Sequence, residues 1–191
     1  MYFFTDRLIG IDRAKLQAKV GDKKLIFMKQ VHGDKVEVVD RHSLAKECDA
    51  MITNDPGVAL CVVVADCIPV ILEDRVKGVV GVAHAGREGS YKGIVKKTIG
   101  MMKKEFSCRD IRVIFGPSIK KCCYEVGAEV VGGFEEFTCR ENGKLFLDLV
   151  ALNIKGLEGV EVIPICTSCD ENYFSFRRDG TKERFCGVVY V

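Results

Sequence analysis

The chain alternates between short apolar runs and polar turns, and the runs in its first half are typical of β-strands. They are rich in Val and Ile and are bounded by Gly, Pro, Asp or Asn. The predicted strands cover residues 24–28, 35–39, 50–53, 58–65, 69–74 and 78–85. The run VALCVVVA at 58–65 shows no polar alternation, so we expect both of its faces to be buried.

The second half of the chain predicts helices between further strands. Residues 90–106 place their apolar positions on one helical stripe, with Ser90 as a possible N-cap. Gly93 and Gly100 weaken this helix, so packing must stabilise it. The pattern also predicts helical segments at 127–137 and 148–156, and strands at 111–116, 160–165 and 184–191.

This order of elements predicts a mixed α/β (α+β) fold. Strands adjoin one another early and alternate with helices later, which favours an extensive mixed β-sheet in layers flanked by helices. The sequence has no linker, repeat or low-complexity tract, and its 191 residues are 48% apolar. We therefore expect a single domain over residues 1–191 with its own core.

The charge pattern argues against nucleic acid and membranes as partners. The net charge is only +2, and the densest basic group reads as the solvated face of a helix (Lys96, Lys97, Lys103 and Lys104). No apolar run approaches the about 18 residues of a membrane span. The start lacks a basic segment and a small-residue cleavage site, so we expect a cytoplasmic protein, monomeric or a small homo-oligomer.

The chain contains ten cysteines, which in a cytoplasmic protein are expected to be reduced. Cys61, Cys108 and Cys186 lie in or beside apolar segments and are expected to pack as small hydrophobic residues.

The remaining clustered cysteines predict little chemistry on their own. Cys166 and Cys169 form a C-x-x-C that could bind metal or cycle redox, but no second C-x-x-C and no histidine lies near it in sequence. We expect the adjacent side chains of Cys122 and Cys123 to diverge. A disulfide among the cysteines is left open.

Three short stretches place a ligand-competent side chain where an apolar strand meets a turn. His32 precedes a glycine in KQVHG, Cys67 follows the strand of ADCIPV, and His84 ends the strand of VAHAG. If Cys67 and His84 belong to adjacent strands, their ends can converge with His32. Two imidazoles and a thiolate form a three-ligand set for zinc that leaves a fourth position for water or substrate. The alternative is two hydrogen-bonded core histidines and a buried thiol.

The chain resembles a known family in an ordered set of motifs. QVHG, CDAMITNDPGVAL, ADCIPVIL, VGVAHAG, FGPSI, CCYEVG and YFSFRRDG resemble the YfiH/YlmD family, the polyphenol-oxidase-like or "laccase domain" family related to FAMIN. The resemblance implies a Zn²⁺ site at His32, Cys67 and His84. It also implies phosphorolysis of adenosine, inosine, guanosine and methylthioadenosine by phosphate, together with adenosine deamination. An editing role on peptidoglycan precursors is attributed to bacterial members.

Two departures from the family pattern stand out. Where the family usually reads AHAGWRG, this chain reads AHAGREG, so Arg87 and Glu88 replace a tryptophan and an arginine. The segment between the opening FFTDRLIGI and QVHG is also unusually short.

Several residues are candidates for the chemistry around this site. Asp66, before the cysteine, could orient a ligand, carry a proton or cap a turn, and Asp49 could hydrogen-bond a ligand histidine or a ribose hydroxyl. Guanidinium groups suit phosphate, which makes the candidates Arg177, Arg178 and Arg87. The alternative for Arg177 and Arg178 is surface ion pairing with Asp179. Ser118 in GPSI offers an anion-binding turn or only a loop start.

Rival functions use the same side chains differently. Cys67 and His84 could form a Cys–His hydrolase, with the thiolate as nucleophile. A copper phenol oxidase is disfavoured because the chain has only three histidines, His42 among them, and a multicopper centre needs many imidazoles. A binding protein that keeps the metal pocket without turnover is the third alternative, and Glu88 is the feature that favours it.

Overall fold

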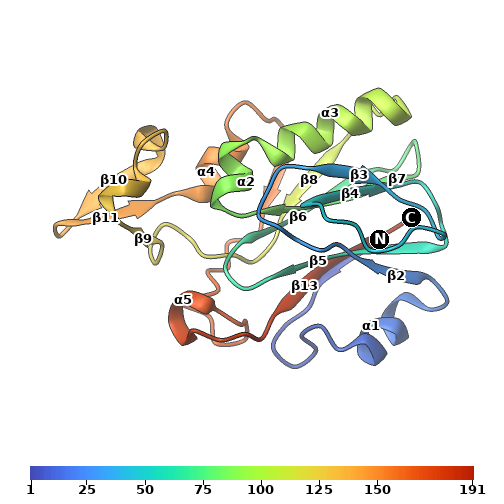
Figure 1. The fold of residues 1–191 in the computed structure, drawn as a ribbon, viewed down its shortest axis with the longest axis horizontal. Helices are drawn as coiled ribbons and strands as arrows, with labels where there is room; N and C mark the ends of the chain where they lie inside the picture. The colour runs from blue at the N-terminus through green and yellow to red at the C-terminus, as the bar shows by residue number, and fades with distance from the viewer.

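Two mixed β-sheets lie face to face between helices in the computed structural model, which describes all 191 residues (Figure 1). The four-stranded sheet has the order β1 (Tyr2–Phe4), β13 (Phe185–Tyr190), β5 (Val58–Val64) and β2 (Lys24–Phe27). The six-stranded sheet has the order β12 (Val160–Val162), β8 (Arg112–Phe115), β6 (Ile68–Asp74), β7 (Val79–Ala85), β4 (Ala50–Thr53) and β3 (Val36–Val38). The pairs β2–β5, β3–β4 and β8–β12 are parallel, and the other pairs are antiparallel.

Alternation along the strands divides the core into three layers. Leu60 and Val62 of β5 and Val80 and Val82 of β7 belong to the cluster between the two sheets. Alternate residues of β7, such as Ala83, pack beneath the helices that cover the six-stranded sheet. On the far side of the four-stranded sheet, Ala59 and Cys61 contact α1. The residues of β5 thus face apolar clusters on both sides, as its sequence predicts.

Helices cover the outer faces of both sheets. Helix α1 (Arg13–Val20) packs on the four-stranded sheet. Helices α2 (Arg87–Tyr91), α3 (Ile94–Phe106) and α4 (Leu149–Ile154) lie on the six-stranded side (Figure 1). A small sheet of β9 (Glu125–Val126), β10 (Thr138–Glu141) and β11 (Lys144–Leu147) projects at one end, and α5 (Phe176–Asp179) lies below it.

The mixed α/β class is confirmed, and each predicted strand has a counterpart. The prediction of one helix over 90–106 was wrong, because Gly93 adopts φ 75° and separates α2 from α3. Ser90 is no N-cap: it accepts a hydrogen bond from Asn153 (2.8 Å). The predicted helix at 127–137 was also wrong, since that glycine-rich stretch forms only two 3₁₀ turns (Ala128–Val130 and Glu135–Phe137).

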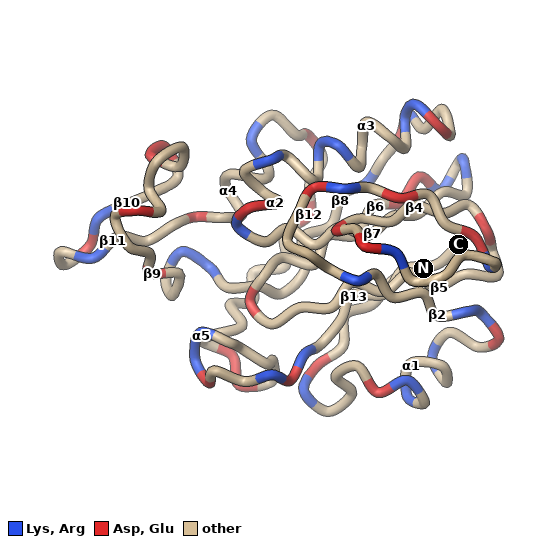
Figure 2. The backbone as a smooth tube through the Cα atoms, viewed as in Figure 1, with Lys and Arg blue, Asp and Glu red and all other residues tan.

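The outer surface mixes charges of both signs. Short segments of lysine or arginine and of aspartate or glutamate are scattered along the backbone, and neither sign is confined to one part of the fold in this view (Figure 2). None of the helices has the length and apolar character that a membrane crossing requires.

The packing between the sheets predicts a matched pair of stability effects. Leu60 is fully buried between the sheets, whereas Leu8 is 80% exposed. We expect Leu60→Ala to lower the free energy of unfolding by about 2–5 kcal/mol, because it removes buried contacts and leaves a cavity. Leu8→Ala should change it by no more than about 0.5 kcal/mol. Urea unfolding of both variants measures this, and equal losses would contradict the layer assignment.

Candidate active site

The register of β6 and β7 brings Cys67 and His84 together. In this antiparallel pair Pro69 lies opposite His84 and Ile68 lies opposite Ala85, so Cys67 comes next to Gly86. His84 follows Val80 and Val82 in facing the space between the sheets. His32 arrives from the loop after β2, and its ring lies 4.8 Å from that of His84, centroid to centroid. One ligand atom each from His32, Cys67 and His84 lies within 4.8 Å of the other two.

Asp49 holds two of these three segments in place. Its Oδ1 contacts His84 Nδ1 at 2.8 Å and accepts the backbone N–H of His32 at 3.0 Å. Its Oδ2 accepts the N–H groups of Val31 (3.2 Å) and Gly33 (2.7 Å). Because Nδ1 of His84 is engaged, Nε2 is the nitrogen left for a ligand. Asp49 therefore orients one imidazole and fixes the loop that carries the other, as carboxylates do behind metal-binding histidines.

The loop around His32 adopts an uncommon backbone conformation. His32 has φ 59°, in the left-handed region that few non-glycine residues visit. The N–H bonds to Asp49 compensate for this strain, which is of the kind that collects at functional sites.

Two glycines leave room for the cluster. A Cβ at Gly86 would lie 3.2 Å from Cys67 Sγ and 3.5 Å from Cδ2 of His32. A Cβ at Gly89 would lie only 2.7 Å from the carbonyl oxygen of Gly33, the neighbour of His32. Gly89 thus lets the histidine loop approach α2 closely, and a side chain at Gly86 would crowd the Cys67 sulfur.

Burial and neighbouring groups shift the pKa values of Cys67, His84 and Asp49. Burial raises the pKa of the Cys67 thiol, but hydrogen bonds from His32 and His84 outweigh this and lower it to about 6. Burial lowers the pKa of His84, yet its bonds to Asp49 and Cys67 raise it to about 9. Burial raises the pKa of Asp49, but the bonds from His84 and the loop N–H groups bring it below its ordinary value.

The donor set fits a zinc ion. Two imidazole nitrogens and one sulfur converge, one histidine is oriented by a carboxylate, and Gly86 leaves the space that a side chain would fill. The set resembles a catalytic site more than a structural one, because it has three ligands and His32 is exposed.

A cavity of about 550 Å³ opens directly on this cluster. That volume lies in the range of small-molecule sites. Its walls combine the cluster with polar, cationic and aromatic side chains (Gln30, Asp66, Tyr124, Phe176, Arg177 and Arg184).

Asp66 anchors one wall of the cavity. It has φ 91°, and its carboxylate accepts the Thr167 hydroxyl and the backbone N–H of Arg177, both at 2.7 Å. The carboxylate thereby joins the start of β6 to the turn at 167 and to α5. This contact places Arg177 at the cavity.

Arg177 and Arg184 present positive charge to the cavity. Arg177 uses only Nη1 to hold the chain, donating to the carbonyls of Glu125 (2.7 Å) and Cys123 (3.3 Å). Arg184 likewise uses Nη1, on the carbonyls of Thr181 and Glu183, both at 2.9 Å. The Nε and Nη2 groups of both side chains have no hydrogen-bond partner within the protein.

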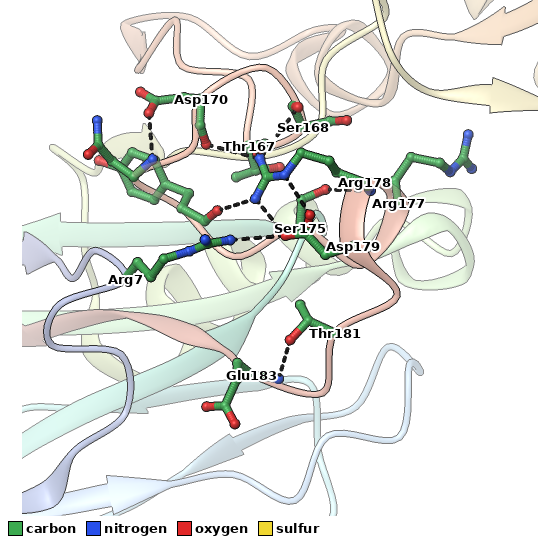
Figure 3. A network of polar contacts seen from close by, with 12 residues as sticks. Arg7, Thr167, Ser168, Asp170, Ser175, Arg177, Arg178, Asp179, Thr181 and Glu183 are labelled. Atoms are coloured by element: carbon green, nitrogen blue, oxygen red, sulfur yellow. Dashed lines mark hydrogen bonds and ion pairs between the residues drawn. The ribbon is translucent and has the colours of Figure 1, made fainter.

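Arg178 and Ser118, two of the sequence candidates for phosphate binding, lie outside the cavity wall. Arg178 donates to Asp179 from Nε and Nη2 and to a series of backbone carbonyls (Thr167, Ser168, Asp170 and Tyr173). Figure 3 shows its guanidinium pointing into this turn, while Arg177 points away from it. Since its donors are engaged, Arg178 stabilises the turn and has none for phosphate. Ser118 is fully buried and accepts the Lys120 ammonium at 3.0 Å.

Arg87 belongs to a neighbouring hollow. Its Nε lies 3.5 Å from Glu88 Oε1, and both line a second depression with Tyr91 and Phe134. The substituted pair is thus a local ion pair on α2 beside the main cavity, and its arginine does not line that cavity.

Sequence reasoning missed Arg184, Tyr124 and Gly89. Arg184 lies in a short polar stretch before the last strand, and the adjacent sequence does not indicate a functional site. Tyr124 and Gly89 lie within or beside the family motifs CCYEVG and AHAGREG and could have been found there.

Comparisons with known proteins identify the family of this chain. The sequence model of the family described as "Multi-copper polyphenol oxidoreductase laccase" matches residues 9–191. A protein of Aquifex aeolicus named purine nucleoside phosphorylase is 38% identical over 96% of this chain and 90% of its own length. One of Mycobacterium tuberculosis with the same general name is 35% identical over 96% and 79%.

Solved structures share the fold. The Bacillus licheniformis hypothetical protein YfiH superposes with a TM-score of 0.83 at 26% identity, over 93% of this chain and 79% of that one. YlmD from Geobacillus stearothermophilus gives 0.80 at 27% identity, over 92% and 77%. With the sequence match over nearly the whole chain, these findings show that the protein belongs to the YfiH/YlmD family of laccase-domain proteins.

Proposed function

We propose that this protein is a zinc-dependent purine nucleoside phosphorylase. The observation that carries the proposal is a three-donor cluster in the wall of a cavity that also exposes two arginines. The names of the relatives support the reaction class. The proposed substrates are phosphate with adenosine, inosine, guanosine or methylthioadenosine, and the products are the free base and a ribose 1-phosphate.

His32, Cys67 and His84 would hold the zinc ion. Zn²⁺, when bound, supplies a Lewis acid that stabilises developing negative charge. The chain itself positions the donors, because Asp49 orients His84 and the loop of His32.

Arg177 and Arg184 are the proposed phosphate-binding residues. In phosphorolysis the phosphate oxygen bonds to C1′ of the ribose while the C1′–N bond breaks and its electron pair leaves with the base. The phosphate must therefore be held as an anion beside a cationic sugar. The free Nε and Nη2 edge of a guanidinium matches two phosphate oxygens. Arg177 and Arg184 both offer this edge at the cavity.

Aromatic side chains could hold the purine. Phe176 is 60% exposed at the cavity, and Tyr124 lines its wall. A planar base stacks favourably on such rings. Asp49 and Asp66 take positioning roles in this proposal, because the first holds metal ligands and the second holds Arg177.

Adenosine deamination is the second proposed activity, and a Cys–His hydrolase acting on cell-wall precursors is the rival. The low pKa of Cys67 favours the rival, because a thiolate is a nucleophile. Stoichiometric zinc would engage this sulfur and exclude that use. A multicopper oxidase, despite the printed family description, fits poorly, because His42 is exposed and lies outside the cluster, leaving two imidazoles.

We expect phosphate-dependent release of free base from inosine or adenosine by the zinc-loaded protein. His32→Ala, Cys67→Ala and His84→Ala should each lower bound zinc and reduce kcat/KM at least about 100-fold, because loss of a ligand exceeds the 10- to 100-fold cost of losing a supporting contact. His42→Ala is the matched control and should retain both. Product separation with and without phosphate, and ammonia release for deamination, are the measurements. Full activity of metal-depleted His84→Ala would overturn the assignment.

Gly89→Ala should disrupt the site without touching a ligand. Its Cβ would meet the Gly33 carbonyl at 2.7 Å, and backbone must move to relieve this contact. We expect reduced zinc retention and activity because the histidine loop shifts. Gly100→Ala, with open space around its Cβ, should instead leave activity unchanged and stabilise helix α3 by about 1 kcal/mol. Equal activity in both variants would contradict the close approach.

Asp49→Asn tests the carboxylate behind the ligands. The asparagine side chain has nearly the same shape as aspartate, but its NH2 group replaces one carboxylate oxygen. That NH2 group would face N–H groups that now donate to the carboxylate. We expect zinc affinity to fall about 10- to 100-fold. Asp22→Asn, at an exposed position, is the control and should bind zinc normally. Competition with a chelator measures the affinity, and an unchanged value for Asp49→Asn would refute this role.

A further inference from the structure

Four cysteines from two distant loops meet beside the cavity. Cys122 and Cys123 lie in the turn after β8, and Cys166 and Cys169 lie in the turn after β12. The sulfur of Cys169 is 3.3 Å from that of Cys123 and 3.8 Å from that of Cys122. All four sulfurs lie within 4.8 Å of one another. The expectation that Cys122 and Cys123 diverge was therefore wrong, since their sulfurs are 3.8 Å apart, and the C-x-x-C does have partners.

Packing does not explain this cluster. The chain's other grouped cysteines, such as Cys61 and Cys186, are buried among apolar side chains. Cys122 and Cys169 are exposed, and Cys123 is half-buried. Thiols that only fill a core have no reason to gather at the surface.

The spacing of the sulfurs suits one tetrahedral ion. A zinc ion with four sulfurs at about 2.3 Å keeps neighbouring sulfurs about 3.8 Å apart. Two of the sulfur–sulfur distances, Cys122 to Cys123 and Cys122 to Cys169, equal this value at 3.8 Å, and that from Cys123 to Cys169 is shorter at 3.3 Å. An iron–sulfur cluster is less compatible, because its irons and sulfides would separate the cysteines further.

The backbone around the cluster is arranged as a ligand turn. The N–H groups of Cys169 (3.1 Å) and Asp170 (2.9 Å) bond to the carbonyl of Cys166, which folds the C-x-x-C so that both sulfurs face one side. The N–H of Lys120 points at Cys166 Sγ at 3.4 Å. Such a donor supports a thiolate, the form in which cysteine binds metal. The parallel bridge between Ser118 and Cys166 aligns the two loops.

We propose that Cys122, Cys123, Cys166 and Cys169 form a second, structural zinc site, closed by four thiolates. It differs from the cluster of His32, Cys67 and His84, which has three ligands and faces the cavity.

This second site would hold the wall of the cavity in place. Tyr124 follows Cys123 and lines the cavity, and the Cys123 carbonyl accepts Arg177 Nη1. Thr167 follows Cys166, and its hydroxyl donates to Asp66. A metal joining the two loops would therefore fix Arg177 and Asp66 from behind, and its binding free energy would stabilise the folded state.

Metal analysis of the full-length protein, purified without chelator, tests the proposal. We expect two zinc ions per chain. Cys169→Ser should retain one, Cys67→Ser should retain the other, and the double variant should retain neither. Cys139→Ser is the matched control: its half-buried thiol contacts Glu141 outside both clusters, and it should keep two ions.

Cobalt substitution assigns each ion to its site. The visible absorption of a tetrathiolate Co²⁺ site should be present in Cys67→Ser and absent in Cys169→Ser. This readout does not depend on phosphorolysis, so failure of the proposed activity and failure of the second site are distinguishable.

Other results would overturn the proposal. One is a zinc content that is the same in Cys169→Ser as in the unmodified protein. Another is iron in place of zinc. A third is a protein mass lower by two hydrogens, which indicates a disulfide. If Cys169→Ser does not fold, the unmodified protein gives the answer. A chelator should expose four additional reactive thiols at the cluster together with release of zinc, and exposure without release would refute the site.

Discussion

The candidate active site depends on one carboxylate, that of Asp49. It is fully buried directly before β4, its backbone carbonyl accepts the N–H of His84, and its carboxylate accepts three consecutive N–H groups of the His32 loop. A buried carboxylate is costly unless its oxygens are bonded, so the folded sheet and the loop impose each other's geometry. The His32 loop has left-handed backbone and few apolar contacts of its own. Gln30 bonds to the backbone of Val63 on one side of this loop, but the N–H groups of Val31, His32 and Gly33 all donate to Asp49.

A second carboxylate, that of Asp66, positions another wall of the cavity. Asp66 bonds the turn at Thr167 and the first residue of the RRD segment in α5, and so places Arg177 at the cavity. Its neighbour Arg178 turns the other way and holds the carbonyls of the same turn. The cationic wall thus rests on loops rather than on sheet. That explains why a clamp between the loops of residues 120–124 and 166–170 would matter to the site more than its surface position suggests.

The sequence predicts those parts of the fold for which the pattern of apolar and polar residues is compatible with only one structure. The non-alternating run of β5 had to be buried on both sides, and side chains at the ends of adjacent strands could meet, as Cys67 and His84 do. Other features depend on tertiary contacts that the local sequence does not reveal. The sequence RRD does not indicate which arginine faces the cavity, because that follows from the Asp66 contact. Cys122 and Cys169 are 47 residues apart in the sequence. Their sulfurs meet because β8 and β12 pair in parallel. Gly93 breaks a helix whose apolar stripe continues across it.

The location of Arg87 and Glu88 beside the main cavity explains how they can replace the family's Trp-Arg pair. The glycines on either side, Gly86 and Gly89, are the positions that the metal cluster needs, and both are kept. The changed residues line a neighbouring hollow, where Arg87 forms an exposed ion pair with Glu88. In the proposed function, anion binding in the main cavity is assigned to Arg177 and Arg184, which line it and have unpaired donor groups. The proposed metal and anion sites therefore use side chains other than those of Arg87 and Glu88, so these two positions of α2 can vary, whereas Gly89 of the same helix cannot.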